Sequence, residues 1–207
     1  IAGTGSNVFG VGADGRGWRA GGWGHQLGDE GSGYWLGLQS IKAALRDRER
    51  SGPETALSDA AVEHFGVASV EALAALVYSK PLTKGEIAEL AIETGRCADR
   101  GDAVACELYE RGARELAGQI AAVIGQTGLQ GEFPVGLIGS AYKAGPIFVG
   151  PLTREIHALA PQAQVGVVEM APVGGSLLLA ARACGASAAL EALNLERLIE
   201  EATARQQ

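Results

Sequence analysis

The sequence predicts an α/β fold, because strand-like and helix-like segments alternate through its last third. Short apolar runs at residues 133–138 and 164–169 indicate strands, and a helical pattern lies between them at residues 146–159. Two more helices are expected, at residues 174–183 and at about residues 195–204. A strand, a helix and a strand at this spacing imply parallel pairing through a crossover helix.

The first half of the chain adds a hairpin and a long helical region. Residues 1–24 are rich in glycine and are expected to form a β-hairpin around a turn at residues 13–15. From Gly33 the apolar residues recur every three or four positions, at Trp35, Leu38, Ile41 and Leu45, which indicates a helix that ends in the charged run at residues 46–50. Residues 54–125 read as helical throughout, and we interpret them as a helical insert.

Start signals divide this insert into separate helices. Ser69 opens an Ala/Leu-rich segment, and Thr83 with Glu86 forms a capping box. Asp102 precedes a long amphipathic stretch that continues to Ile124. The insert is therefore expected to contain several helices.

Composition narrows the classes of partner and compartment. A net charge of -7 and a pI near 5.0 argue against a nucleic-acid partner. The three cysteines, Cys97, Cys106 and Cys184, are too scattered for a disulfide framework, which favours a reducing, cytoplasmic setting. No signal segment is visible and no apolar run reaches the ~18 residues of a membrane span, so no membrane partner is expected. The chain begins at Ile1 without methionine, and we expect further residues to precede it.

Three turns combine glycine with a hydroxyl residue: Gly3-Thr4-Gly5-Ser6, Gly139-Ser140 and Gly174-Gly175-Ser176. Backbone N–H groups in such turns can bind phosphate oxygens, which approach closely because glycine has no side chain. Each turn taken alone is also typical of ordinary chain reversal, since many turns need a positive φ. Their combination indicates a phosphate site more strongly than any one of them.

Several common catalytic motifs are missing from the sequence. It contains no Walker-type phosphate loop, no Gly-x-Gly-x-x-Gly motif that opens a helix after the first strand, and no serine nucleophile elbow. The three histidines, His25, His64 and His157, form no His-x-x-x-His pair. No protein-held metal centre is expected from these residues.

The segment GGWGHQLGDEGSGYW, residues 21–35, contains six glycines, two tryptophans and an adjacent Asp29 and Glu30. With the GTGSN run at residues 3–7, this block resembles the C-terminal lobe of N-acetylglucosamine kinases, in the BadF/BadG/BcrA/BcrD branch of the sugar kinase, actin and heat-shock ATPase superfamily. The likeness continues through residues 135–144 and 173–182. It implies that residues 1–207 form a ribonuclease-H-like, actin-like ATPase lobe with a mixed sheet.

The resemblance also implies two sets of site residues. The family's ATP-binding positions correspond here to Thr4, Gly5, Ala88, Gly139, Ser140, Ala144 and Gly175. The positions that bind the sugar correspond to Ser6, Asn7, Gly22, Trp23, Gly24 and Asp29. The residue types suit these roles, because a threonine hydroxyl can contact phosphate, while asparagine and aspartate can hydrogen-bond to the amide and hydroxyl groups of an amino sugar.

The activity that the resemblance implies is transfer of the γ-phosphoryl group of ATP, with Mg2+, to the 6-hydroxyl of N-acetylglucosamine or glucosamine. In this family an N-terminal lobe carries the phosphate loop and the general base. Neither has a counterpart here, so the catalytic base of this chain is unknown and residues 1–207 alone are expected to be inactive. The implied partners are the amino sugar, ATP and the N-terminal lobe, with a homodimer as one option.

Two other functions stay open. Related activator ATPases drive electron transfer and hold an iron–sulfur cysteine near the Gly-Thr-Gly run, but the first cysteine here is Cys97. A sugar-binding relative without phosphoryl transfer would keep the same pocket residues. Only the N-terminal lobe would distinguish that relative from a kinase.

Overall fold

The computed structural model describes residues 1–79, 82–170 and 172–185, in two compact units divided after Val167. The predicted helix at about residues 195–204 lies outside the described residues. The first unit contains β1 (Asn7–Val11), β2 (Gly17–Gly21), α1 (Gly33–Arg48), α2 (Leu57–Phe65), α3 (Val70–Ser79), α4 (Lys84–Asp99), α5 (Ala103–Thr127), β3 (Pro134–Leu137), η1 (Ser140–Ala144), α6 (Pro146–Leu159) and β4 (Gln164–Val167). The second unit contains α7 (Pro172–Ala183).

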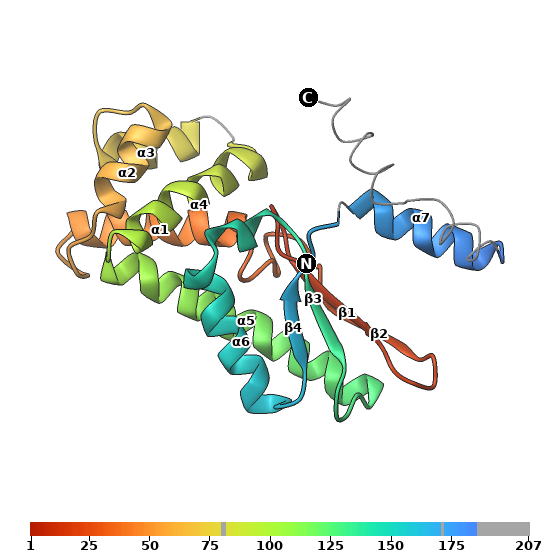
Figure 1. Ribbon diagram of the computed structural model, residues 1–207. Helices are drawn as coiled ribbons and strands as arrows, with labels where there is room; N and C mark the ends of the chain where they lie inside the picture. The colour runs from red at the N-terminus through yellow and green to blue at the C-terminus, as the bar shows by residue number, and fades with distance from the viewer. Residues whose placement is uncertain (80–81, 171, 186–207) are drawn as a thin grey trace. The chain divides into compact units, whose positions relative to one another are not determined.

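The predicted N-terminal hairpin is confirmed. Strands β1 and β2 pair antiparallel, with Asn7 opposite Gly21 and Val11 opposite Gly17. The turn between them is closed by the Asp14 carboxylate, which accepts a hydrogen bond of 2.9 Å from the Arg16 N–H. The hairpin packs against α5, which lies along it in Figure 1.

The parallel pair with its crossover is also confirmed. Strands β3 and β4 pair in parallel, and η1 and α6 form the connection between them. Helix α6 begins at Pro146, a position where the missing N–H costs no hydrogen bond. Its bounds match the helix predicted at residues 146–159.

Instead of one mixed sheet, the described residues form two separate two-stranded sheets. Ala2 links the two sheets. Its N–H donates to the Ile138 carbonyl at 2.8 Å, its carbonyl accepts from the Ala141 N–H at 3.0 Å, and it bridges to Ser6 beside β1. The α/β class is therefore correct, and Ala2 connects two small sheets where a continuous sheet was expected.

Small residues let α1 and α4 pack closely. The buried face of α1 contains Gly33, Gly37, Ser40 and Ala44 beside Leu36 and Ile41. A Cβ at Gly37 would overlap the Ile87 carbonyl oxygen of α4, so a larger side chain would push the helices apart. The Ser40 and Thr94 hydroxyls, both fully buried, lie 2.7 Å apart and hydrogen-bond across this contact.

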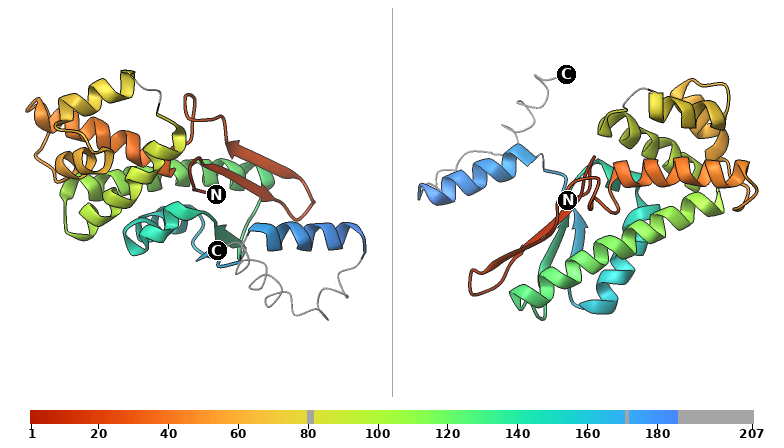
Figure 2. Two further views of the ribbon diagram at one scale, coloured as in Figure 1. Left: turned by 90° about the horizontal axis from the view of Figure 1, so that it is seen from above. Right: turned by 180° about the vertical axis from the view of Figure 1, so that it is seen from behind.

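The helical region at residues 54–125 contains α2 to α5, and α3, α4 and α5 each begin directly after the predicted start signal at Ser69, Thr83 or Asp102. Thr83 and Glu86 form the capping box of α4, and the Asp102 carboxylate accepts from the Ala105 N–H at the start of α5. Helix α5 contacts β1, β2 and α6 as well as α1 and α4. Figures 1 and 2 show it running from the group of helices α1 to α4 past both strand pairs. It therefore belongs to the central core rather than to a separable insert.

Aromatic rings fill the core where α5, η1 and α6 meet. Phe148 is fully buried between Tyr142, stacked at a centroid distance of 5.5 Å, and Tyr109, tilted at 5.3 Å. These contacts fix η1 against α5.

Among residues 1–79, 82–170 and 172–185, no single helix is long and apolar enough to cross a membrane. Helices α2 and α3 reach that length and hydropathy only when taken together, as a pair bent by 48°.

The close contact of α1 with α4 gives a stability prediction. Gly37→Ala should lower the free energy of unfolding by about 1–3 kcal/mol, because the added methyl group meets backbone that cannot move alone. Gly118→Ala in α5, where a Cβ would meet nothing within 4 Å, is the matched control and should raise stability by about 0.5–1 kcal/mol. Urea unfolding measures both variants, and equal effects would contradict this packing.

Candidate active site

The Gly3-Thr4-Gly5-Ser6 turn is docked on the N-terminus of α1. The N–H groups of Gly33 and Tyr34 donate to the carbonyls of Gly3 and Thr4 at 2.7 and 3.3 Å. The first N–H groups of α1 are thus already satisfied by the turn and are not available to an anion. Within the described chain, by contrast, no acceptor contacts the N–H groups of Thr4 and Gly5.

The second glycine turn, at Gly139-Ser140, lies directly against the first. Gly139 has a φ of 125°, and a Cβ there would overlap the Ala2 carbonyl oxygen, so only glycine fits. A Cβ at Gly3 would lie 3.9 Å from the Ser140 hydroxyl oxygen, which shows how closely the turns approach. Two of the three predicted turns are therefore neighbours. The third, Gly174-Gly175-Ser176, forms no turn, because these residues already lie inside α7, which begins two residues earlier at Pro172 in the second unit. The role of Gly175 therefore stays a prediction.

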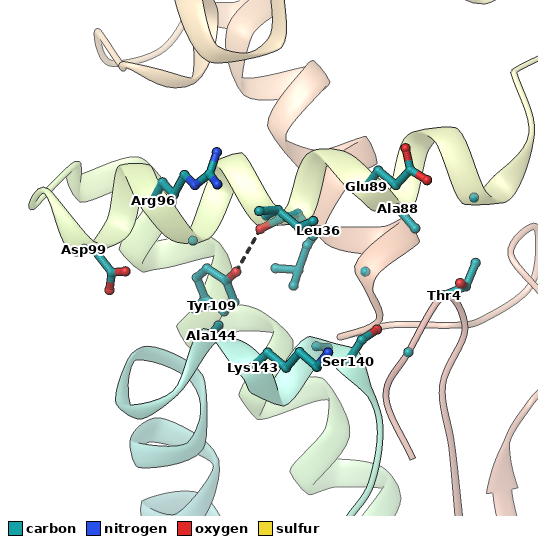
Figure 3. A pocket seen from close by; sticks show the side chains of 17 residues that line it. Thr4, Leu36, Ala88, Glu89, Arg96, Asp99, Tyr109, Ser140, Lys143 and Ala144 are labelled. Atoms are coloured by element: carbon teal, nitrogen blue, oxygen red, sulfur yellow. Dashed lines mark hydrogen bonds between the residues drawn. The ribbon is translucent and has the colours of Figure 1, made fainter. Parts of the chain in front are cut away.

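A cavity of about 430 Å³ opens beside these two turns. Figure 3 shows it between α4 on one side and Thr4, Ser140 and η1 on the other. Its volume falls in the range typical of small-molecule sites. Four of the residues predicted to bind ATP line it: Thr4, Ala88, Ser140 and Ala144. The other two within the first unit, Gly5 and Gly139, lie in the adjoining turns.

The cavity also contains charged residues that the sequence did not single out. Arg96 is paired with Glu93 at 2.6 Å, whereas Lys143 has no ion-pair partner among the residues that the structure describes. Lys143 lies three residues after Ser140 in η1, and both residues line the cavity on the same wall as the glycine turns. Its place three residues after a glycine–serine turn is the only sequence signal that could have indicated it.

No protein-only metal site accompanies this cavity. Within the described ranges, no three His, Cys, Asp or Glu side chains are grouped so that they could hold an ion. Asp99 and Glu89 each line the cavity singly. Mg2+ normally binds through one or two carboxylates together with substrate phosphates, so these residues do not by themselves fit a resident ion.

Two buried tyrosines are neutral groups near the cavity: Tyr109 lines it, and Tyr142 lies in η1 between two lining residues. The Tyr109 hydroxyl donates to the Ala91 carbonyl at 3.2 Å, and burial raises the pKa of Tyr109 far above its usual value. Burial likewise raises the pKa of Tyr142 to about 12. Both phenols therefore stay protonated at neutral pH and do not act as bases there.

The residues predicted to bind sugar gather on the other side of the same turn. The Ser6 carbonyl accepts from the Gly22 N–H at 3.1 Å, and a Cβ at Gly22 would lie 3.2 Å from that of Asn7. Trp23 projects from this loop with 69% of its surface exposed and carries the Arg19 guanidinium 5.5 Å from its ring centroid. Gly24 has a φ of 83°, which lets the loop bend after Trp23.

Asp29 is buried, and its carboxylate is anchored by two hydrogen bonds. Its side chain is only 5% exposed and its φ of 64° is unusual for a residue other than glycine. One carboxylate oxygen accepts from the Ser6 N–H at 3.1 Å, and the other lies 2.9 Å from the Lys84 ammonium nitrogen. A Cβ at Gly5 would lie 2.9 Å from this carboxylate, so Gly5 is needed for the contact.

Ser6 does not present its hydroxyl to a ligand in this arrangement. The residue is 3% exposed, and its hydroxyl donates to the Glu30 carbonyl at 2.7 Å. Ser6 therefore fixes the turn around Asp29, and its direct contact with a sugar stays a prediction. Ser6, Asp29 and Lys84 together form what we call the Asp29 cluster. The sequence could not indicate that Lys84, 55 residues from Asp29, belongs to it.

The geometry combines a cavity beside two glycine turns with the buried Asp29 carboxylate, which Ser6 and Lys84 hold next to the first turn. The chain belongs to the BadF/BadG/BcrA/BcrD ATPase family, whose model matches residues 1–180. This finding confirms the family that the glycine and tryptophan motifs indicated.

Among relatives of known name, the chain is 38% identical over 132 residues to the N-acetylmuramic acid/N-acetylglucosamine kinase of Clostridium acetobutylicum, covering 64% of this chain and 43% of that protein. It is 30% identical over 184 residues to the N-acetyl-D-glucosamine kinase of Dictyostelium discoideum, covering 87% and 57%. The chain thus spans about half the length of these relatives.

Solved structures agree with the fold. A protein from Chromobacterium violaceum, solved as a candidate N-acetylglucosamine kinase, matches with a TM-score of 0.63 and 26% identity over 79% of this chain and 53% of that one. A similar candidate from Porphyromonas gingivalis matches with a TM-score of 0.57 and 21% identity over 81% and 54%, and it supports the fold alone.

The contact between Gly5 and Asp29 can be tested by adding one methyl group. Gly5→Ala should lower the free energy of unfolding by about 1–3 kcal/mol, because the carboxylate that it meets is anchored on two sides. Gly3→Ala, whose Cβ would lie no closer than 3.9 Å to any neighbour, should change stability by less than about 0.5 kcal/mol. Urea unfolding of both variants decides the matter, and a Gly5→Ala protein as stable as the wild type would refute this geometry.

Proposed function

We propose that this chain is the C-terminal lobe of a two-lobe, ATP-dependent amino-sugar kinase whose preferred substrate is N-acetylglucosamine. The observation that carries the proposal is that the turns at Gly3–Ser6 and Gly139–Ser140 meet beside one cavity, with the Asp29 cluster directly behind. The names of the two relatives support the same activity. The match to sugar kinases supports the finer assignment of a ribonuclease-H-like, actin-like ATPase lobe.

The cavity is the proposed nucleotide site. The free N–H groups of Thr4 and Gly5, with the Thr4 and Ser140 hydroxyls, would donate to phosphate oxygens. Lys143 would supply a positive charge to the same groups. Ala88 and Ala144, on opposite walls, would leave room for the adenosine. Gly139 would act by holding the second turn against the first.

The loop behind the turn is the proposed sugar site. Asn7 can both donate to and accept from an acetamido or hydroxyl group, and the exposed Trp23 offers an apolar ring face. The bends at Gly22 and Gly24 would admit the sugar close to the backbone. Each Asp29 oxygen already accepts one hydrogen bond and keeps a lone pair for a sugar hydroxyl.

The proposed reaction places the γ-phosphoryl group of ATP on the sugar 6-hydroxyl. The chain would contribute mainly by positioning the two substrates, which supplies much of the acceleration in phosphoryl transfer. Asp29 is engaged by Ser6 and Lys84, so we assign it to sugar orientation and expect the general base from the N-terminal lobe. Mg2+ would enter with the nucleotide and neutralise phosphate charge, and we assign no residue of this chain to it.

The cellular setting and the protein partners are also part of the proposal. Cys97, Cys106 and Cys184 are free thiols, which supports a reducing cytoplasm. The N-terminal lobe is proposed as the main protein partner, and homodimer formation remains one option.

A sugar panel tests the function. The full-length protein that contains this chain should phosphorylate N-acetylglucosamine with a kcat/KM at least about tenfold above that for glucose, because glucose leaves the amide partners of the pocket unpaired. ADP release measures the rates, with glucosamine and N-acetylmuramic acid included because the preferred amino sugar decides the substrate class. Residues 1–207 alone should show no turnover. Equal or better use of glucose would contradict the proposal, and the absence of any sugar-dependent turnover would favour a non-catalytic binding protein.

A further inference from the structure

Lys84 joins the two proposed substrate sites. It is the first residue of α4, directly after the Thr83 cap, and its ammonium nitrogen lies 2.9 Å from the Asp29 carboxylate. The next residues of the same helix, Gly85, Ala88 and Glu89, line the cavity. The Lys84 side chain thus connects the Asp29 carboxylate, the proposed sugar ligand, to the helix that forms one wall of the proposed nucleotide site.

The position of Lys84 is not explained by the stability of α4. A positive charge in the first turn of a helix opposes the macrodipole, which favours anions there. The ion pair also gains little as a stabilising contact, because the Lys84 side chain is 38% exposed and remains partly solvated. The first turn of α4 already has its own stabilising device in the capping box of Thr83 and Glu86.

The second carboxylate oxygen of Asp29 is oriented by Lys84. The Ser6 N–H anchors one carboxylate oxygen and leaves the other to be oriented by Lys84. The wall of α4 is close by, because a Cβ at Gly33 would lie 3.2 Å from the Gly3 carbonyl and 3.5 Å from the Ala88 Cβ. Movement of the N-terminal end of α4, which carries both Lys84 and Ala88, would therefore change the space beside Gly3 and the direction of the Asp29 carboxylate together.

We propose that Lys84 is a positioning residue that holds the Asp29 carboxylate and the first turn of α4 in one arrangement, and so links sugar affinity to nucleotide affinity. This inference rests on the proposed function, because it takes Asp29 as the sugar ligand and the cavity as the nucleotide site. Lys84 need not touch either substrate. Its effect is exerted through the two groups that it fixes.

Calorimetry of the full-length protein tests this link, with N-acetylglucosamine and the non-hydrolysable analogue AMP-PNP as separate ligands. Lys84→Met should weaken sugar binding about fivefold or more, because an oriented charge-assisted hydrogen bond is lost. It should weaken AMP-PNP binding about threefold or more through the released turn of α4. Lys84→Arg, which keeps the charge and donors, should stay within about twofold of the wild type for both ligands.

The matched control is Lys42→Met, which removes an exposed lysine of α1 that contacts neither proposed site and should change nothing. Thermal unfolding checks that each variant is folded, and Lys84→Gln serves in place of Lys84→Met if the latter is not. A folded Lys84→Met or Lys84→Gln protein in which both affinities are unchanged, or in which only one is altered, would overturn the link. Turnover by the wild type is measured separately, so binding of both ligands without phosphorylation would reject the proposed kinase activity and still test Lys84.

Discussion

The site depends on one buried carboxylate. Asp29 adopts a left-handed backbone conformation and holds the Ser6 N–H with one oxygen and Lys84 with the other. Burying a charge in this way is tolerable only when it is hydrogen-bonded and paired. Because Ser6 follows the Gly3–Gly5 turn and Lys84 begins α4, this carboxylate joins two segments that lie on either side of the cavity.

Close backbone approach makes this arrangement possible. Gly139 lies on Ala2, Gly5 faces the Asp29 carboxylate, and Gly37 lets α1 approach α4 at Ile87. In each place a side chain would force two segments apart. The glycines of this chain therefore act in two ways, since some leave N–H groups open to a ligand while others bring distant segments close enough to form the cavity.

Sequence patterns predicted the elements better than the contacts between them. Period and capping residues located the hairpin, the crossover helix and the helices after Thr83 and Asp102, because these signals are local. They were less accurate for α1: of the predicted apolar positions Ile41 is buried, but Trp35, Leu38 and Leu45 are only partly buried. Small residues such as Gly37, Ser40 and Ala44 complete the buried face. The pairing of Asp29 with Lys84 and the approach of Ser140 to Gly3 depend on tertiary packing, so no spacing in the sequence could reveal them. Family resemblance supplied the site residues Thr4, Ala88, Ser140 and Ala144, and folding brings these four to one cavity.

A crystal structure of the full-length protein with AMP-PNP and N-acetylglucosamine tests the central claim, that the cavity between α4 and the two glycine turns binds the nucleotide. The account predicts adenosine between Ala88 and Ala144, with phosphate oxygens about 3 Å from the N–H groups of Thr4 and Gly5 and sugar hydroxyls at Asp29. A nucleotide bound elsewhere, with those two N–H groups unoccupied, would contradict it.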